Sequence, residues 1–242
     1  MTTLFIADCH LSPERPQIIE LFCDFIETRC QSAQALYILG DLFDRWLGDD
    51  DPTPGLEAVF TTLRKYARTK PLYFMSGNHD FLVGRAFSER SGCRFVGGQP
   101  SEDAVVVDIE GNKTLLMHGD QLCSDDIAYQ RYRRVVRNRM LQTLWKAMPL
   151  AWRQSFAERL ISTSKHATAK KAETIMDVND NTVKATMRRY QVQRLIHGHV
   201  HRPAIHDFTL DGNNAKRMVL GDWYEQGSVL EVSEEHATLD RL

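Results

Sequence analysis

The segment Thr3-Leu4-Phe5-Ile6-Ala7-Asp8-Cys9-His10 begins with an apolar run and ends in a carboxylate and an imidazole. A short run of this composition is typical of a strand that is buried on both faces. Four more apolar runs lead into polar clusters in the same way. The runs are 35–39, 72–75, 114–117 and 194–197, and their clusters are 40–44, 77–80, 118–120 and 198–201. Because strand ends are rigid supports, we expect the five clusters to form one site.

The side chains in these clusters are ones that bind divalent metal ions. Carboxylates, imidazoles and a side-chain amide suit a borderline or hard ion such as manganese or zinc, and no thiolate cluster competes. If the strands continue through their clusters, Asp8 and His10 face one side, and His199 pairs with His201 by the same parity. Asp41 is then expected to bridge two ions. Two ions about 3.5 to 4 Å apart activate a hydroxide and clamp a phosphoryl group.

The order of the clusters is more specific than any single cluster. An Asp-X-His triplet, or a histidine pair at a strand end, is common in proteins without metal. Here five clusters follow one another, with glycines that let the backbone turn sharply beside Asp41, Asn78 and His199. The ordered set therefore predicts a two-metal site.

In this order the chain resembles the calcineurin-like metallophosphoesterases, whose pattern is Asp-X-His, Gly-Asp-X-X-Asp, Gly-Asn-His-Asp/Glu, a lone His and Gly-His-X-His. All five blocks are present. The resemblance implies two divalent ions, with manganese favoured. It implies that the first ion is held by Asp8, His10, Asp41 and His201, and the second by Asp41, Asn78, His118 and His199. It also implies two catalytic residues, His79 at the scissile phosphate and Asp80 orienting it.

The fold class expected is α/β. Strand-like runs alternate with amphipathic helical patterns at 17–30, 56–67 and 81–91, which indicates βαβ units. Further strands are expected at 104–109 and 113–117, joined by a Gly111-Asn112 hairpin turn, and at 204–208, 216–220 and 228–232. The resemblance implies that these elements form a four-layer α/β/β/α sandwich. We expect one domain over residues 1–242.

A helical stretch at about 125–190 interrupts the strand pattern and is predicted to be a cap inserted into the domain. Residues 127–171 contain eleven Lys or Arg and a single acid, Glu158, interleaved with aromatic and aliphatic residues. This mixture is typical of helices at an anionic interface, although a solvated basic face over a packing stripe is the simpler alternative. Because the stretch lies between metal-ligand blocks, we expect its apolar surface to wall the tail of a lipid substrate.

Stretches that reach beyond the general metal pattern resemble the branch of the family that acts in lipid A synthesis, at 3–8, 35–43, 46–52, 80–84, 117–123, 175–179 and 197–203. The likeness extends nearly end to end. It implies hydrolysis of the pyrophosphate of UDP-2,3-diacylglucosamine to UMP and 2,3-diacylglucosamine 1-phosphate, with attack on the α-phosphorus. It also implies substrate contacts at Asn78, His79, Asp126, Ser164, Thr168, Lys171 and His199.

Two positions depart from that branch, which commonly has Arg at the position of His79 and Asn at the position of Thr168. A histidine supplies charge or a proton but lacks the bidentate guanidinium fork. Thr168 is shorter and has no amide nitrogen. For three other contacts a structural role is the alternative: Asp126 as a helix cap, Ser164 as a local hydrogen bonder and Lys171 as a solvated lysine.

Composition limits the partners and the compartment. With 30 basic and 32 acidic residues the formal charge is −2, so we expect no nucleic-acid partner, and no obligate protein partner either. The five cysteines have neither paired nor zinc-finger spacing, which fits a reducing compartment. Because the N-terminus lacks a signal-peptide pattern and no run reaches about 18 apolar residues, we expect a cytoplasmic protein. Its basic apolar segment predicts peripheral contact with the inner membrane.

Three alternatives remain open at this stage. Another metallophosphoesterase, such as a nucleotide or phosphoprotein phosphatase, would share every metal ligand and differ in the cap. A non-enzymatic scaffold on the same fold should have lost ligands, and none is lost. A membrane-binding module depends only on the basic apolar segment.

Overall fold

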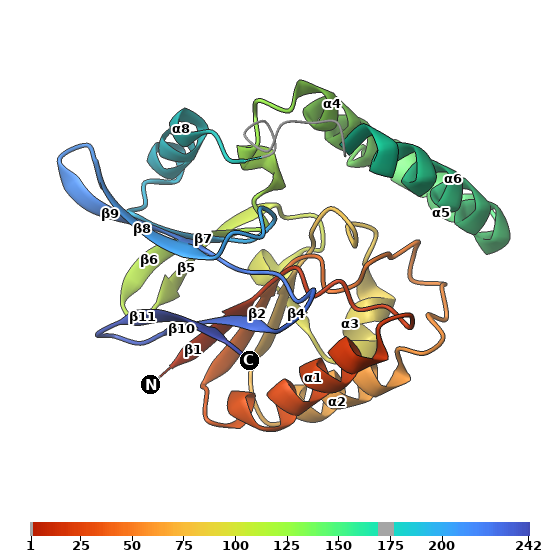
Figure 1. Cartoon of the computed structure of the whole chain (residues 1–242), viewed down its shortest axis with the longest axis horizontal. Helices are drawn as coiled ribbons and strands as arrows, with labels where there is room; N and C mark the ends of the chain where they lie inside the picture. The colour runs from red at the N-terminus through yellow and green to blue at the C-terminus, as the bar shows by residue number, and fades with distance from the viewer. Residues whose placement is uncertain (1, 169–176) are drawn as a thin grey trace.

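Two stacked sheets form the centre of the molecule, a computed structural model that describes residues 2–168 and 177–242, without the side chains of 160–168 (Figure 1). The first sheet has the order β11-β10-β1-β2-β3-β4. Its strands are β1 Thr3–Ile6, β2 Ala35–Leu39, β3 Leu72–Met75, β4 Arg94–Phe95, β10 Ser228–Val232 and β11 Ala237–Arg241. Strands β1 to β4 are parallel, so the polar clusters after β1, β2 and β3 lie at one edge.

The second sheet has the order β5-β6-β7-β9-β8, and its three central strands are parallel. The strands are β5 Ala104–Ile109, β6 Asn112–Met117, β7 Arg194–His197, β8 Ala204–Leu210 and β9 Asn213–Val219. The remaining two polar clusters follow β6 and β7. All five clusters therefore come from the ends of central parallel strands, as the sequence predicts.

Helices cover both outer faces, which gives the expected four layers. The helices α1 Pro16–Glu27, α2 Glu57–Ala67 and α3 Arg85–Ser91 lie on the first sheet, where Phe22, Val59 and Phe87 share a core with Leu4 and Leu36. Helix α8 Asp180–Tyr190 lies on the second sheet. Apolar side chains from both sheets meet between them: Phe5, Leu39, Leu116, Ile196 and Leu230. Burial on both faces explains the continuous apolar runs.

Helices α4 Ile127–Val136, α5 Arg139–Ala147 and α6 Leu150–Thr168 stand away from the sandwich, as the green arm of Figure 1 shows. The predicted insertion at about 125–190 also included α8. In the structure Val183 and Met187 of α8 pack with Leu115 and Leu195 of the second sheet. Helix α8 therefore belongs to the outer layer of the sandwich, and only α4 to α6 stand apart.

Several boundaries differ from the predicted ones for local reasons. The hairpin turn between β5 and β6 is Glu110-Gly111, one residue earlier than predicted, and both residues have the positive φ that a type I′ turn requires. Helix α3 begins at Arg85 because the Asp49 carboxylate accepts the amides of Gly84 and Ala86. Strands β4 and β11 were not predicted. Short 3-10 turns occur at Arg29–Gln31, Val96–Gly98 and Asp120–Leu122.

None of the helices in the described part of the chain is both long enough and apolar enough to cross a bilayer.

Candidate metal centre

The metal-ligand candidates stand on loops rather than on strands. Strand β1 ends at Ile6, before Asp8 and His10, and β7 ends at His197, before His199 and His201. These four residues and Asp41 have left-handed φ values between 46° and 73°. The strand-parity argument was therefore wrong. A left-handed φ is uncommon outside glycine and marks strain that the surrounding structure must hold.

Backbone hydrogen bonds between the loops hold this conformation. The loop after β1 runs along the loop after β2, with the amides of Asp8 and His10 donating to the carbonyls of Gly40 and Asp41 at 3.0 and 2.9 Å. The loops of the second sheet are joined in the same way, since the Gly198 amide donates to the His118 carbonyl at 2.7 Å. The backbone of these predicted ligands is thus held by hydrogen bonds within the protein.

Glycine is required at Gly77 by close approach. A Cβ atom placed there would lie 2.0 Å from Asp41 Oδ1. Only a residue without a side chain lets the loop after β3 come so close to this carboxylate. A sharp turn was predicted at this glycine, but its φ is not in the left-handed region, whereas the φ of Gly40 is 93°.

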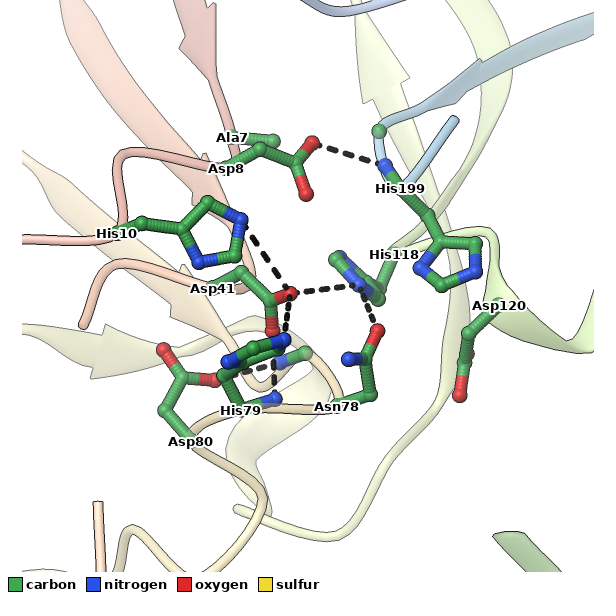
Figure 2. A network of polar contacts seen from close by, with 12 residues as sticks. Ala7, Asp8, His10, Asp41, Asn78, His79, Asp80, His118, Asp120 and His199 are labelled. Carbon is green, nitrogen blue, oxygen red and sulfur yellow. Dashed lines mark hydrogen bonds and ion pairs between the residues drawn. The ribbon is translucent and has the colours of Figure 1, made fainter. Parts of the chain in front are cut away.

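Asp41 lies at the middle of the cluster, as Figure 2 shows. Its Oδ2 is 3.5 Å from His118 Nε2, 3.9 Å from His10 Nε2 and 4.0 Å from His79 Nε2. Its Oδ1 accepts the backbone amide of His79 at 2.8 Å. One carboxylate oxygen that faces three imidazoles is well placed to be shared by cations.

Three groups of potential ligand atoms occur among the described residues. Within each group the atoms lie within 4.8 Å of one another. The groups are Asp8 with His10 and His201, His10 with Asp41 and His79, and Asp8 with Asp41 and His118. Both ring nitrogens of His10 are buried without a hydrogen-bond partner in the described part of the chain, and the buried Asp8 Oδ1 faces His201 Nε2 at 3.3 Å. Leaving such atoms unpaired costs about 1 to 3 kcal/mol each. Divalent cations would satisfy them, so the residues present fit the ions that the sequence predicts.

Of the other predicted ligands, Asn78 lies beside His118 and His199 lies farther out. Asn78 Oδ1 is 2.9 Å from His118 Nε2, and His118 Nδ1 is 2.9 Å from the Leu39 carbonyl, which leaves Nε2 facing the centre. The His199 ring is 5.2 Å from the His118 ring and outside the three groups, and Figure 2 shows it on the side of Asp120.

The predicted catalytic pair is arranged differently from the expectation that Asp80 orients His79. The buried Asp80 carboxylate accepts the backbone amides of Leu42 and Gly77 at 2.8 and 2.7 Å. It thereby joins the loops that carry Asp41 and Asn78. The His79 ring is held instead by the Asp44 carbonyl, 2.7 Å from Nδ1, and its side chain is 40% exposed at the edge of the cluster.

The electrostatics of the cluster favour cations. Burial would raise the pKa of Asp8 and Asp41, but the surrounding imidazoles outweigh it and lower both pKa values. Burial lowers the pKa of His10, and lowers that of His199 to about 4, so both rings are neutral and able to bind metal. Burial, with Asp41 adding to it, raises the pKa of Asp80 to about 6.

Asp222 contacts the cluster and was missed in the sequence. His201 Nε2 faces Asp8 Oδ1 at 3.3 Å, while its Nδ1 faces Asp222 Oδ2 at 3.2 Å. Burial would lower the pKa of His201, but these two carboxylates outweigh it and raise the pKa to about 10. The signal in the sequence was Gly221-Asp222, which follows β9 as Gly40-Asp41 follows β2.

The predicted substrate contacts in the cap region fall in three places. Asp126 caps α4, because its side chain accepts the Tyr129 amide at 3.0 Å. Ser164 and Thr168 lie in α6, with side chains outside the described ones. Lys171 lies outside the described residues. All four substrate roles stay predictions.

The model of the calcineurin-like phosphoesterase family matches residues 1–203. The chain belongs to this family. Members use divalent metal ions, and the groups around Asp41 supply the candidate ligands here. Among solved structures, an archaeal phosphodiesterase aligns over the whole of both chains with 11% identity and a TM-score of 0.48.

Curated relatives of this phosphoesterase cover its full length. The UDP-2,3-diacylglucosamine hydrolase of Xanthomonas axonopodis pv. citri is 48% identical over 250 residues, which cover 100% of this chain and 99% of the relative. The hydrolase of the same name from Aeromonas salmonicida is 46% identical over 244 residues, which cover 100% of this chain and 93% of the relative. The likeness therefore includes the segment of α4 to α6 as well as the sandwich.

Proposed function

We propose that this phosphoesterase hydrolyses the pyrophosphate bond of UDP-2,3-diacylglucosamine, giving UMP and 2,3-diacylglucosamine 1-phosphate in lipid A synthesis. The observation that carries the proposal is the ligand cluster around Asp41 in a chain similar, from end to end, to hydrolases named for this substrate. The end-to-end likeness favours this reaction over that of a nucleotide or phosphoprotein phosphatase, which needs only the sandwich.

Seven side chains hold two divalent ions in this proposal, with Mn2+ as the physiological metal. Asp8, His10 and His201 serve the first ion, Asn78, His118 and His199 the second, and Asp41 both. When bound, such ions acidify a water molecule and neutralise charge on a phosphoryl group. His199 lies outside the three groups of ligand atoms, while its backbone amide donates to Asp8 Oδ2 at 2.8 Å, so its ring would have to turn toward the cluster.

His79 is the residue proposed to touch the phosphate. Its Nε2 is 4.0 Å from Asp41 Oδ2, and the ring is exposed, whereas His10 and His118 are buried and His199 and His201 half-buried. The carboxylates of Asp41, Asp44 and Asp80, together with the Asp44 carbonyl, raise its pKa against the effect of burial. A protonated imidazole at this edge stabilises negative charge that develops on phosphoryl oxygens. Asp80 acts by positioning, through the amides of Gly77 and Leu42.

Helices α4 to α6 are proposed to be a cap, inserted in a single domain of residues 1–242, that takes the lipid half of the substrate. A groove of about 480 Å³ lies on α5 and α6, lined by Trp145, Met148, Trp152, Ser155, Phe156 and Arg159. Its size and apolar walls suit acyl chains, and the Arg159 guanidinium suits an anionic head. The substrate would then contact Asn78, His79, Asp126, Ser164, Thr168, Lys171 and His199.

The same helices are proposed to touch the cytoplasmic face of the inner membrane. Large apolar side chains are exposed on them, among them Ile127 at 61%, Met140 at 76% and Leu144 at 64%. They lie among basic residues that an anionic leaflet attracts. Binding to vesicles that contain phosphatidylglycerol should weaken with salt, whereas salt-independent binding or none would contradict the contact.

Hydrolysis in heavy-oxygen water tests the reaction. Purified protein loaded with Mn2+ should cleave UDP-2,3-diacylglucosamine in detergent and place the label in UMP. Label in the sugar phosphate would overturn the site of attack. Rapid cleavage of a phosphoprotein or a cyclic nucleotide, with none of the diacylated nucleotide sugar, would overturn the proposed function itself.

A further inference from the structure

Three residues of α4 and its C-terminal cap, Tyr129, Arg133 and Arg137, form a stripe that faces the metal centre. Tyr129 and Arg133 are four residues apart, and Arg137, four residues further, caps the helix with helical backbone angles. Residues with this spacing lie on one face of a helix. The side chains of Arg133 and Arg137 are only 15% and 13% exposed, which is low for cations on a helix that stands away from the sandwich.

The first contact of this stripe is with the loop of His118. Arg133 Nε donates to Asp120 Oδ2 at 2.6 Å, and the Tyr129 hydroxyl donates to the same oxygen at 2.9 Å. Asp120 is buried and lies two residues after His118. Two donors from the cap therefore fix the segment that follows a predicted ligand.

The second contact is with the loop of Asn78. Arg137 Nη2 donates to the Gly77 carbonyl at 2.8 Å, in the peptide group that leads into Asn78. The guanidinium also lies 3.3 Å from Ser76 Oγ and 5.3 Å from the centre of the Phe81 ring. Because the planar Arg137 guanidinium is held on several sides, it has little freedom to move and fixes the Gly77 carbonyl that it binds.

Asp103 joins the two arginines. Its Oδ1 is 3.0 Å from Arg137 Nη1 and its Oδ2 is 2.8 Å from Arg133 Nη2. The stripe also reaches the third loop, because the Tyr129 ring lies 5.9 Å from the His199 ring. The three loops in contact with the stripe are those of Asn78, His118 and His199.

We propose that Tyr129, Arg133 and Arg137 form a brace that couples the position of the cap to occupancy of the second ion. Asn78, His118 and His199 would hold this ion, and the loops of these three residues hold the brace. In return, a cap that leaves its place takes away the donor on the Gly77 carbonyl. Such coupling is reciprocal, so the ion should order the cap as much as the cap tightens the ion. The inference depends on the proposed ligand assignment but not on the substrate.

Metal binding by Arg137→Met, compared with Arg139→Met, tests the brace. Arg139 is the matched control, because it donates to Ser101 Oγ at 3.0 Å, near Asp103, without touching a ligand loop. Dialysed protein is titrated with Mn2+ and the bound ions are counted. In Arg137→Met one of the two ions should lose about 10- to 100-fold in affinity, the usual effect of removing an outer-shell partner. The other ion, and both ions of Arg139→Met, should bind as in the parent protein.

Hydrogen exchange of α4 to α6 gives the reciprocal readout. Added Mn2+ should protect these helices in the parent protein and in Arg139→Met, and leave them unprotected in Arg137→Met. If Arg137→Met binds both ions with parental affinity, loses both equally, or keeps the protection, the brace is refuted. If this variant fails to fold, Asp103→Asn takes its place, since it weakens both arginine contacts and should change both readouts in the same direction. Neither readout uses the substrate, so a protein that shows this coupling but leaves the diacylated nucleotide sugar intact would refute only the function.

Discussion

Asp8 and His199, 191 residues apart in the chain, are joined by a hydrogen bond of 2.8 Å from the His199 backbone amide to Asp8 Oδ2. Asp8 follows the first sheet and His199 follows the second. This bond therefore connects the two sheets inside the metal cluster, and it aligns two predicted ligands without using the atoms that would face the ions.

Replacement of Asp8 should separate its two roles. In Asp8→Ala the His199 amide loses its acceptor, which should lower the free energy of unfolding of the metal-free protein by about 1 to 3 kcal/mol. Asp8→Asn keeps an acceptor oxygen but loses the charge, so its stability should stay nearer the parent while metal binding falls as much as in Asp8→Ala. Urea unfolding and metal analysis measure the two effects. Equal destabilisation by both substitutions would contradict the role of the hydrogen bond.

Asp80 and His79 should differ in what their removal changes. Asp80→Ala leaves the amides of Gly77 and Leu42 without an acceptor in a buried place, and should cost about 2 kcal/mol or more in unfolding free energy. His79→Ala removes a half-exposed ring and should leave stability near that of the parent while turnover falls. Thermal unfolding and steady-state kinetics compare the pair. A stable Asp80→Ala protein would show that this carboxylate does not hold the loops.

Metal binding should release protons. The pKa of His201 is about 10 in the metal-free protein, so its ring is protonated at neutral pH, and an ion must displace that proton. Competition by protons is strongest at low pH, so the apparent affinity should rise from pH 6 toward pH 10. Asp222→Asn removes one of the two carboxylates and should reduce the release. Calorimetry in two buffers of different ionisation enthalpy measures it, and identical enthalpies in both buffers would speak against this picture.

The groove on α5 and α6 should matter only for a lipid substrate. Trp152 is 69% exposed and lines the groove. Trp152→Ser should raise KM for the diacylated substrate about 10-fold, the effect of losing roughly 1.5 kcal/mol of apolar burial. Cleavage of soluble bis(p-nitrophenyl) phosphate should not change. The control is Val106→Ser, an exposed apolar residue of β5. An equal loss on both substrates would argue against an acyl site.

Arg153 should hold α6 to the sandwich. It is fully buried, and its guanidinium donates to the Leu47 carbonyl at 2.7 Å and pairs with Asp50. Arg153→Met leaves that carbonyl without this donor, so proteolysis within α5 and α6 should accelerate. If the variant is cleaved no faster than the parent protein, α6 is held by other contacts.

The sequence was sufficient for the architecture of the site because its determinants are local. Each of the five apolar runs forms a strand, and each polar cluster follows directly, so parallel pairing within each sheet and the stacking of the two sheets bring Asp8, Asp41 and His118 together. The left-handed loops were not predictable, since the conformation of Asp8 depends on a carbonyl of the neighbouring loop, at Gly40. The helical stretch predicted at about 125–190 did not reveal that its last helix, 180–190, covers the second sheet.

Other features were missed because their signal is short or distant. Strand β4 has two residues, Arg94 and Phe95, too few for any period to be visible. Asp222 carries no histidine beside it, and its position near His201 depends on the pairing of β9 with β7. Asp80 was predicted to orient His79, its neighbour in sequence. Its partners are instead backbone amides, which no side-chain pattern reveals.

Electron paramagnetic resonance of the protein loaded with two equivalents of Mn2+ tests the central claim most directly. Two ions that share the Asp41 carboxylate, about 3.5 to 4 Å apart, should give the multiline spectrum of a spin-coupled pair. In Asp41→Ala the coupled signal and the hydrolysis should disappear together. A parent protein that shows only the spectrum of isolated ions, or binds a single ion per chain while it hydrolyses the substrate, would contradict the account.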